Sequence, residues 1–429
     1  MDVMARICVI SHSHYPWDSR VSREMHALVQ AGHQVDLICL QHGGQPPIER
    51  AGPVSIYRLP IARLRGGFLR YFFELATFQI AATLLLVWLH LRHRYSLVET
   101  TSVPDWLVFA ALPAKLFGAR VLLDLHECMP EYGMTKWGVS PRHPLVRFLR
   151  VMERASIRFA DFVTTCTEQM RERFVERGAP PEKIAVVLNS FDEERFDPDR
   201  YRRTRTDDDR FVLVHHGTIE PNYGLDVVVR AVALLRDKIP GLRFEIYGGG
   251  THRAAVEALT KELGLDDRVH FTGWLLPEEL LGRLADADVG VVAVRRDAFR
   301  DVTLCIKMFD LISMRRPVVI SRTRAVEAYF GNECFQLFES GNEEDLARAI
   351  YELYADPDLR SRLVRHATAV NEPYRWVHQA GRYVDIAERL IAGVPTASKR
   401  AAAMAASSAA TNPSSEARSP TWPVSTGGR

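Results

Sequence analysis

Two kinds of segment alternate along most of this 429-residue sequence: short runs of Val, Ile and Leu, and longer stretches with helical periodicity. The alternation is typical of an α/β protein, in which helices cover both faces of a parallel sheet. A helix is predicted at Ser19–Ala31, since Gly32 follows it in the position of a C-cap. In the first half of the sequence, the apolar runs predict strands at Arg6–Ser11, Gln34–Leu40, Ser55–Pro60, Ser96–Thr101, Val121–Glu127, Phe162–Thr167 and Ile184–Asn189.

A polar, charge-rich stretch at 192–210 then interrupts the alternation and is interpreted as a linker. One hydrophobic core rarely organises a chain of this length, so we predict doubly wound domains at 1–191 and 211–373 with a cleft between them. A helix follows at 374–394, and the Ala-, Ser- and Pro-rich tail at 395–429 is predicted to be disordered. In the second domain, strands are predicted at Phe211–Gly217, Arg243–Gly249, Val269–Trp274, Val289–Val294 and Pro317–Ser321.

The composition narrows the possible partners and the compartment. The 55 basic and 53 acidic side chains nearly cancel, so the net charge gives no sign of a nucleic-acid partner. The six cysteines form no C-x-x-C pair, and we expect buried free thiols in a reducing compartment. The apolar run Ile7–Ser11 is too short for the core of a signal peptide, so we expect a cytoplasmic protein.

The segment Leu75–Leu91 is almost continuously apolar, and arginines flank it on both sides. It is shorter than the roughly 20 residues that a spanning helix needs, and it contains Gln79 and His90. A buried core helix is our first interpretation. A helix that also rests on the membrane surface is the second, because arginines are attracted to anionic lipid, and it would make the protein peripheral on the inner face, with contacts through 63–94. A true span is the third.

Ligands of parallel sheets bind beyond the carboxyl ends of the strands, so the loops at these ends are the candidate sites. The first strand leads into a polar and aromatic loop, 12–20, rather than the G-x-G-x-x-G of a dinucleotide-binding protein. Two later strands end in the glycine turns Gly217-Thr218 and 247–250, whose backbone amides could approach a phosphate. Glycine turns are a weak signal, because any tight turn from a strand to a helix uses them.

Two pairs of side chains also suggest a site. His126 and Glu127 follow a predicted strand, which places an imidazole and a carboxylate at the mouth of the cleft; the alternative is a structural loop histidine. Lys307 and Asp310 are three residues apart, hence on one face of a helix. They could hold a diphosphate and a ribose, or form an ordinary exposed ion pair.

Taken in order and spacing, these motifs resemble those of the retaining glycosyltransferases of family 4. The resemblance extends to about Ala392. It implies the GT-B fold, with two facing Rossmann-like domains and a C-terminal helix, here 374–394, that crosses back onto the first domain. The motifs are Tyr15-Pro16-x-Asp18-x-Arg20, Ala31-Gly32-His33-x-Val35, Asp124-x-His126-Glu127, Gly217-Thr218-Ile219, Tyr247-Gly248-Gly249-Gly250 and Lys307-Met308-Phe309-Asp310 followed by Pro317-Val318-Val319.

The resemblance also implies a division of roles. The second domain would bind a nucleotide diphosphate sugar and the first domain the acceptor. His126 and Asp310 would be catalytic, and no metal or other cofactor would be needed, because cations, backbone amides and helix dipoles stabilise the leaving diphosphate. The implied contacts are Gly217, Thr218, Gly248, Gly249, Gly250 and Lys307 with the diphosphate, Tyr247, Trp274 and Asp310 with the nucleoside, and Tyr15, Asp18, Arg20 and Glu127 on the acceptor side.

The sequence departs from the family pattern at two places. Val302 stands where the first of two acidic residues is usual, although Asp301 is adjacent and could substitute for it. The usual arginine and lysine after Gly217 are missing too, since Thr218 and Tyr223-Gly224 occupy their places. Lys307 could offset that loss, as it does in a subset of the family.

We therefore expect a retaining glycosyltransferase, acting on a glycan or lipid-linked acceptor in the synthesis of a cell-surface glycan or exopolysaccharide. A sugar-nucleotide epimerase or a phosphorylase would share the fold. A non-catalytic nucleotide-sugar binder is the remaining alternative, suggested by the missing acidic and basic residues.

Overall fold

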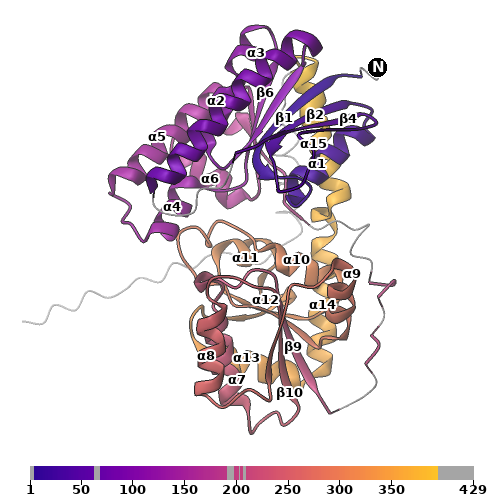
Figure 1. Cartoon of the computed structure of the whole chain (residues 1–429). Coiled ribbons are helices and arrows are strands. Elements are labelled where there is room, and N and C mark those ends of the chain that lie inside the picture. The colour runs from indigo at the N-terminus through magenta and orange to yellow at the C-terminus, as the bar shows by residue number, and fades with distance from the viewer. Residues whose placement is uncertain (1–3, 62–67, 191–197, 202, 206–208, 395–429) are drawn as a thin grey trace, which may run out of the picture.

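The computed structural model describes residues 4–61, 68–190, 198–201, 203–205 and 209–394, which form the two α/β domains of Figure 1. The first domain has an eight-stranded sheet in the order β3-β4-β2-β1-β5-β6-β7-β8. All neighbours are parallel except β3 and β4. The strands are β1 (Arg6–His14), β2 (Gln34–Leu40), β3 (Ile48–Ala51), β4 (Val54–Leu59), β5 (Leu97–Thr101), β6 (Arg120–Leu125), β7 (Phe162–Thr165) and β8 (Ile184–Val186).

The second domain has a six-stranded parallel sheet in the order β11-β10-β9-β12-β13-β14. The α/β fold with two Rossmann-like domains is therefore confirmed, and every strand predicted from the sequence is present. Most of the predicted linker 192–210 and the whole tail 395–429 lie outside the described residues. The strands are β9 (Phe211–His216), β10 (Leu242–Tyr247), β11 (Val269–Gly273), β12 (Val289–Val292), β13 (Val318–Ser321) and β14 (Gln336–Phe338).

Helices pack on both faces of each sheet. The first, α1 (Ser19–Gln30), ends one residue earlier than predicted, and the Asp18 carboxylate caps it by accepting hydrogen bonds from the backbone amides of Arg20 and Val21. The others in the first domain are α2 (Phe68–His93), η1 (Asp105–Ala111), α3 (Leu112–Leu116), α4 (Met129–Trp137), α5 (Pro144–Phe159), α6 (Glu168–Glu176) and η2 (Pro181–Lys183). Those that follow are η3 (Pro221–Tyr223), α7 (Leu225–Leu235), α8 (Arg253–Glu262), α9 (Pro277–Asp286), α10 (Ile306–Ser313), α11 (Arg324–Tyr329), α12 (Gly331–Cys334), α13 (Glu343–Ala355), α14 (Pro357–Asn371), η4 (Glu372–Tyr374) and α15 (Trp376–Ile391).

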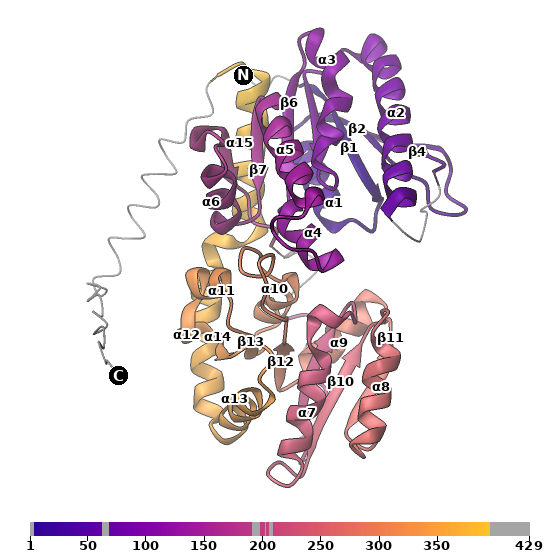
Figure 2. The ribbon, with the colours of Figure 1, turned by 90° about the vertical axis from the view of Figure 1, so that its left-hand side faces the viewer.

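The last helix, α15, crosses back onto the first domain, as the resemblance implied. It is the yellow helix beside α1 in Figure 1, and Figure 2 shows it from the side. Its buried face packs into the core that also contains Ile7, Val9 and Leu28. The Tyr383 hydroxyl on this helix donates a buried hydrogen bond to Glu99 Oε2 on β5. This hydrogen bond thus anchors α15 to a central strand of the first sheet.

The burial of Glu99 makes stability depend on pH. Burial raises the pKa of Glu99 to about 8, and the nearby Asp124 carboxylate acts in the same direction. The folded protein therefore binds a proton that the unfolded chain releases between about pH 4.5 and pH 8, and the free energy of unfolding falls as pH rises through this window. We expect Glu99→Gln to remove that fall, which amounts to about 1.4 kcal/mol per unit of pKa difference. Urea unfolding at pH 5 and pH 8, with the exposed Glu182→Gln as control, measures it; parallel pH profiles would contradict the prediction.

The apolar segment Leu75–Leu91 lies in α2, and only one face of this helix is buried. Phe78, Ala82 and Leu86 pack into the first core, whereas several large apolar side chains on the opposite face are exposed. By length and composition, Arg70–His93 is a candidate membrane span within the described part of the chain, with a third of its most apolar window buried. The interpretation as a fully buried core helix is therefore wrong for the outer face.

The prediction of buried free thiols is confirmed for five of the six cysteines. All six cysteines are free, and five of them are buried. The exception is Cys166, which is partly exposed where β7 gives way to α6. Its position faces the space between the two domains.

The two domains also meet through a loop of the second domain, between β12 and α10. Val302 in this loop is completely buried and belongs to the hydrophobic core of the first domain. The Thr167 hydroxyl donates a 2.5 Å hydrogen bond to the Val302 carbonyl, and the Glu168 amide donates one to the Tyr329 hydroxyl. These contacts fix one side of the cleft between the domains.

Candidate active site

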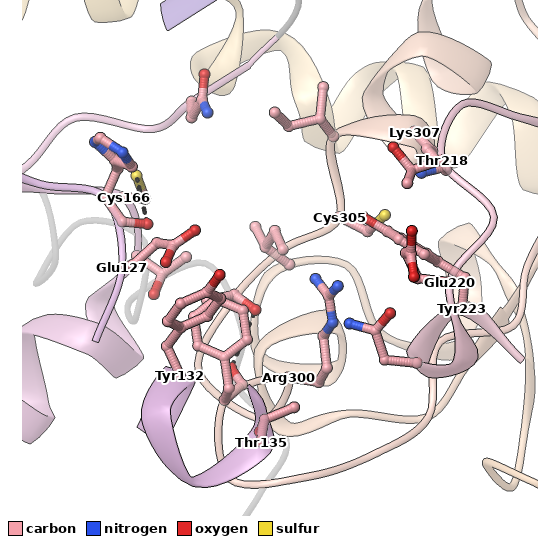
Figure 3. Close-up of a pocket in the computed structure, with 18 of the residues that line it drawn as sticks. Glu127, Tyr132, Thr135, Cys166, Thr218, Glu220, Tyr223, Arg300, Cys305 and Lys307 are labelled. Carbon is pink, nitrogen blue, oxygen red and sulfur yellow. Dashed lines mark hydrogen bonds between the residues drawn. The ribbon is translucent and has the colours of Figure 1, made fainter. Parts of the chain in front are cut away.

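A cavity of about 810 Å³ lies between the domains, at the carboxyl ends of the strands. Figure 3 shows Glu127, Tyr132 and Cys166 on the wall formed by the first domain and Thr218, Tyr223 and Lys307 on the wall formed by the second. Of the residues predicted for the site, the cavity walls contain His126, Glu127, Thr218 and Lys307.

His126 follows β6 on the wall of the first domain. Its Nδ1 lies 3.3 Å from Asp124 Oδ2, and its backbone amide donates a hydrogen bond to the Ser102 hydroxyl. An ionised carboxylate only accepts hydrogen bonds, so Nδ1 carries the proton and Nε2 is the acceptor of the neutral ring. Asp124 thus fixes both the orientation and the tautomer of His126.

Asp124 is held in turn by Arg20. The guanidinium donates two hydrogen bonds to the carboxylate, at 2.7 and 2.5 Å, and the Thr164 hydroxyl donates a third. Burial alone raises the pKa of Asp124, but Arg20 and the hydrogen bonds from His126 and Arg20 outweigh it and hold the pKa below its usual value. Arg20 was predicted to lie on the acceptor side, yet it is 4% exposed and stands behind His126. It reaches the cavity wall through Asp124, which holds His126, and through a 3.2 Å hydrogen bond from its Nη1 to Cys166 Sγ.

Glu127 lines the cavity wall, and one of its carboxylate oxygens has no hydrogen-bond partner among the described residues. This oxygen, Oε2, is buried. Burial raises the pKa of Glu127, while His126, Arg300 and Lys136 lower it to a smaller extent. Buried polar atoms are usually paired, so this oxygen is suited to a ligand hydroxyl.

Lys307 lies in the first turn of α10 on the opposite wall. Its ammonium sits 3.8 Å from the centre of the Tyr223 ring. Gly217, with φ of +92°, makes room for it, because a Cβ at this position would lie 3.2 Å from Lys307 Nζ. The glycine turn and the lysine therefore fit against each other as one unit.

Arg300 is a second cation on this wall, and no sequence motif pointed to it. Its guanidinium lies 5.1 Å from the Tyr223 ring, so Lys307 and Arg300 share that ring. Arg300 Nε is buried without a hydrogen-bond partner, and neither cation forms an ion pair with a carboxylate in the described part of the chain. Tyr223 stands in the segment where the basic pair is missing, and its ring contacts both cations.

The glycine turn at 248–250 does not line the cavity. It packs behind the 217–219 loop, where the Gly217 and Ile219 amides donate hydrogen bonds to the carbonyls of Tyr247 and Gly249. A Cβ on Gly248 would clash with the Gly217 carbonyl oxygen, and one on Gly250 would clash with that of Ile219. These glycines are required for close packing that shapes the loop carrying Thr218.

The acidic positions are occupied differently from the family pattern. Asp310 Oδ2 lies 2.9 Å from His216 Nε2, just behind the cavity wall formed by its neighbour Phe309. Asp301 accepts hydrogen bonds from Arg296 Nε and the Arg324 amide, outside the cavity, so it does not replace the first acidic residue. Val302, at that position, is buried in the core of the first domain.

Four other predicted contacts also lie outside the cavity. Tyr247 is buried in the core of the second domain, and Asp18 is occupied in capping α1. Tyr15 packs against the core of the first domain that contains α15. Trp274 is 70% exposed, and its indole nitrogen approaches Gly249 at the surface.

The described residues contain no group of three or more His, Cys, Asp or Glu side chains placed to hold a metal ion. Side chains bring positive charge to the cavity, with Lys307 and Arg300 on one wall and Lys136 on the other.

Comparison with known proteins identifies both halves of the chain. Residues 18–190 match the model of a Glycosyl transferase 4-like domain, and residues 210–356 match that of Glycosyl transferases group 1. A GDP-mannose-dependent phosphatidylinositol monomannoside mannosyltransferase of Mycolicibacterium smegmatis is 30% identical over 206 residues, which are 46% of this chain and 54% of that protein. The chain thus spans little more than half of that relative's length.

Longer matches agree with this assignment. One subunit of the human phosphatidylinositol N-acetylglucosaminyltransferase is 24% identical over 81% of this chain and 69% of its own length. Among solved structures, a sucrose-phosphate synthase from Thermosynechococcus elongatus superimposes with a TM-score of 0.73 at 20% identity, over 91% of this chain and all of that one. Anabaena HepE, solved in complex with UDP, gives a TM-score of 0.66 at 14% identity, over 89% of this chain and 99% of its own. With both halves matched in this order on two facing domains, the chain belongs to the family 4 glycosyltransferases of the GT-B fold.

Proposed function

We propose that this protein is a retaining glycosyltransferase that moves a sugar from a nucleotide diphosphate sugar to an acceptor held by the first domain. The observation that carries the proposal is the cavity itself, in which Lys307 and Arg300, without carboxylate partners among the described residues, face His126 and Glu127 across the cleft. A diphosphate needs cations, and a reacting sugar needs hydrogen-bond partners. The wall of the second domain supplies the cations, and the wall of the first domain supplies the hydrogen-bond partners.

In the proposed reaction, the bond between the anomeric carbon and the diphosphate oxygen breaks, and the diphosphate leaves with the electron pair. Lys307 and Arg300 stabilise its growing negative charge, so the side chains themselves take the place of a metal ion. The acceptor hydroxyl attacks from the same face, and its proton passes to the leaving oxygen. Configuration at the anomeric carbon is thereby retained.

His126 and Glu127 position the sugars in this scheme. With Nδ1 bound to Asp124, His126 Nε2 is available to accept a hydrogen bond from a donor-sugar hydroxyl. Glu127 Oε2, buried without a hydrogen-bond partner among the described residues, accepts one from the acceptor. Holding both reactants in line supplies much of the rate enhancement in reactions of this kind.

Thermal unfolding with a panel of nucleotide sugars, in the presence of EDTA, tests the donor assignment. A ligand that binds only the folded state raises the Tm by mass action. GDP-mannose and UDP-glucose come first, because relatives are named as GDP-mannose-dependent and HepE was solved with UDP-glucose. We expect one nucleotide class to raise the Tm without added metal. If no nucleotide sugar does so, the donor site and the proposal fail together.

The acceptor is proposed to be a glycan or lipid-linked intermediate of a cell-surface glycan or exopolysaccharide, reached while the protein rests on the inner face of the membrane. The exposed apolar face of α2 supports this proposal, since it includes Phe73, Ile80, Leu84 and Trp88. Arg92 stacks on Trp88 at 3.8 Å, which brings a cation to the same surface. Flotation with vesicles containing phosphatidylglycerol, compared with phosphatidylcholine alone, measures the contact.

A non-catalytic nucleotide-sugar binder is the second candidate, because buried Val302 stands where the family has an acid. This alternative predicts a donor-induced rise in Tm with no release of nucleoside diphosphate in any mixture of acceptors. Turnover of the donor in a membrane extract that contains glycolipid acceptors would exclude it.

A further inference from the structure

Lys136 stands at the edge of the cavity, on the wall of the first domain, with aromatic rings around it. Its ammonium lies 4.8 Å from the ring centre of Tyr71, 5.2 Å from that of Tyr132 and 5.5 Å from that of Trp137. Tyr71 belongs to α2 and the other two rings to α4. Contacts with three rings hold the cation at one place beside His126 and Glu127.

A narrow apolar seam begins directly beside this cluster. It runs between α2, α4, η1 and α5, and Tyr71 and Trp137 belong to both the seam and the Lys136 cluster. The void inside is only about 10 Å³, so a ligand would lie along the seam rather than within it. The lining consists of Tyr71, Phe72, Leu75, Trp106, Met129, Trp137, Leu145, Phe148 and Leu149.

The seam opens onto the exposed surface through a row of three rings. Trp106 lies 6.4 Å from Phe72 on one side and 5.9 Å from Phe148 on the other. Phe72 is 44% exposed and Phe148 is 40% exposed. From there the apolar surface continues along the outer face of α2 at Phe73 and Ile80.

The charge of this surface is one-sided. On the described residues of α2 and α5, which form this surface, neither carboxylate is exposed, whereas six arginines are. On α5, the one acidic side chain, Glu153, is buried and bonded to Arg177. An apolar surface with only positive exposed charges is complementary to an anionic amphiphile. The exposed arginines are Arg70, Arg92, Arg147, Arg150, Arg154 and Arg158.

We propose that Lys136 and its aromatic cluster bind the phosphate of a lipid phosphate acceptor, whose hydrocarbon chain leaves the active site along the apolar seam to the surface of α2 and α5. This inference rests on the proposed transferase function and deepens it by naming the acceptor class and its binding site. The phosphate at Lys136 places a hydroxyl on the attached headgroup within the cavity that His126 and Glu127 line.

The seam favours a hydrocarbon chain over a peptide or a soluble sugar. Backbone amides and sugar hydroxyls would lose their hydrogen bonds to water against a lining of aromatic and aliphatic side chains. A hydrocarbon chain loses nothing there and gains from the removal of apolar area from water. The cation at the inner end and the apolar rings at the outer end match the order of groups in a lipid phosphate.

Binding of decyl phosphate, a soluble probe with both groups, tests the inference in the full-length protein. We expect decyl phosphate to bind at least about tenfold more tightly than inorganic phosphate or decanol, because only it engages both the cation and the seam. Lys136→Met should weaken its binding by about tenfold and leave that of decanol unchanged. Phe148→Gln should weaken the binding of decyl phosphate and leave the binding of inorganic phosphate unchanged.

Two matched controls separate the site from general effects of charge and surface. Lys261→Met removes an exposed lysine of the second domain, and Val151→Gln changes an exposed apolar residue of α5 outside the seam. Neither should alter decyl phosphate binding. Equal affinity for inorganic phosphate and decyl phosphate, or equal effects of control and test variants, would overturn the proposal. The donor-induced rise in Tm should persist in every variant, so failure of the lipid site is distinguishable from failure of the transferase assignment.

Discussion

Replacing Arg300 and Lys307 together with methionine is expected to abolish the donor-induced rise in Tm, and each single replacement should weaken donor binding by about tenfold to a hundredfold. Hydrogen bonds to charged groups contribute about 1.5–3 kcal/mol each, which corresponds to this range. Both cations lie on one wall of the cavity, and neither has a carboxylate partner in the described part of the chain that could absorb its charge. A diphosphate is therefore the group that they are placed to neutralise.

The matched control is Arg230→Met, which removes an exposed arginine of α7 from the same domain. It should leave donor affinity unchanged. Tyr223→Leu tests whether the Tyr223 ring supports both cations. It should weaken donor binding less than either cation variant does, because the charges remain while their orientation is lost. If the double methionine variant still binds the donor, the diphosphate site lies elsewhere.

The sequence predicted the two domains because long apolar strands separated by helices leave a strong periodic signal. It did not predict β3 or β14. All four residues of β3 are exposed and partly charged, so this antiparallel edge strand lacks an apolar run. At three residues, β14 is too short for a pattern to appear. Pairing with β4 and β13 forms these strands, and such pairing is a tertiary effect.

The candidate site was predictable where chemistry followed directly from a strand end or a helix turn, as for His126, Glu127 and Lys307. Arg300 was not predicted from the sequence because it lies in an irregular loop, and it is the fold that brings it to the ring of Tyr223. Arg20 shows the opposite difficulty. A polar residue just after a polar loop suggests an accessible side chain, whereas its partner Asp124 lies 104 positions away in the sequence and takes it into the core.

The largest loss of stability is expected for Arg20→Met. Arg20 is bonded to Asp124 and lies 3.1 Å from Glu24, and both carboxylates are buried. Arg20 holds the pKa of Asp124 below its usual value, so these two form an ionised pair at neutral pH, whereas burial raises the pKa of Glu24. Removing one partner of a buried ion pair costs about 3–5 kcal/mol, because the remaining charge is left without compensation. Urea unfolding measures this loss, with the exposed Arg142→Met as the control.

The pH dependence of this loss distinguishes an electrostatic cause from simple loss of packing. In the wild type, Arg20 holds the pKa of Asp124 below its usual value, so this pair stabilises the protein above about pH 4 and the contribution is lost as pH falls. In Arg20→Met, burial raises the pKa of Asp124 instead, and the variant should lose further stability as pH rises from 5 to 8. A loss that is the same at both pH values would show that only packing was removed.

The same pair should control the orientation of His126, which is proposed to contact the donor sugar but not the diphosphate. Asp124→Asn keeps the shape of the side chain but removes the charge that fixes the proton on His126 Nδ1. We expect kcat to fall by about a hundredfold, a usual cost of a misplaced reacting group, while the donor affinity measured by thermal shift falls much less, because Lys307 and Arg300 still hold the diphosphate. A purely structural role for Asp124 would lower stability and donor affinity together and leave the kcat of the folded fraction intact. The separation of kcat from donor binding thus decides whether the buried network behind His126 serves catalysis or only the fold.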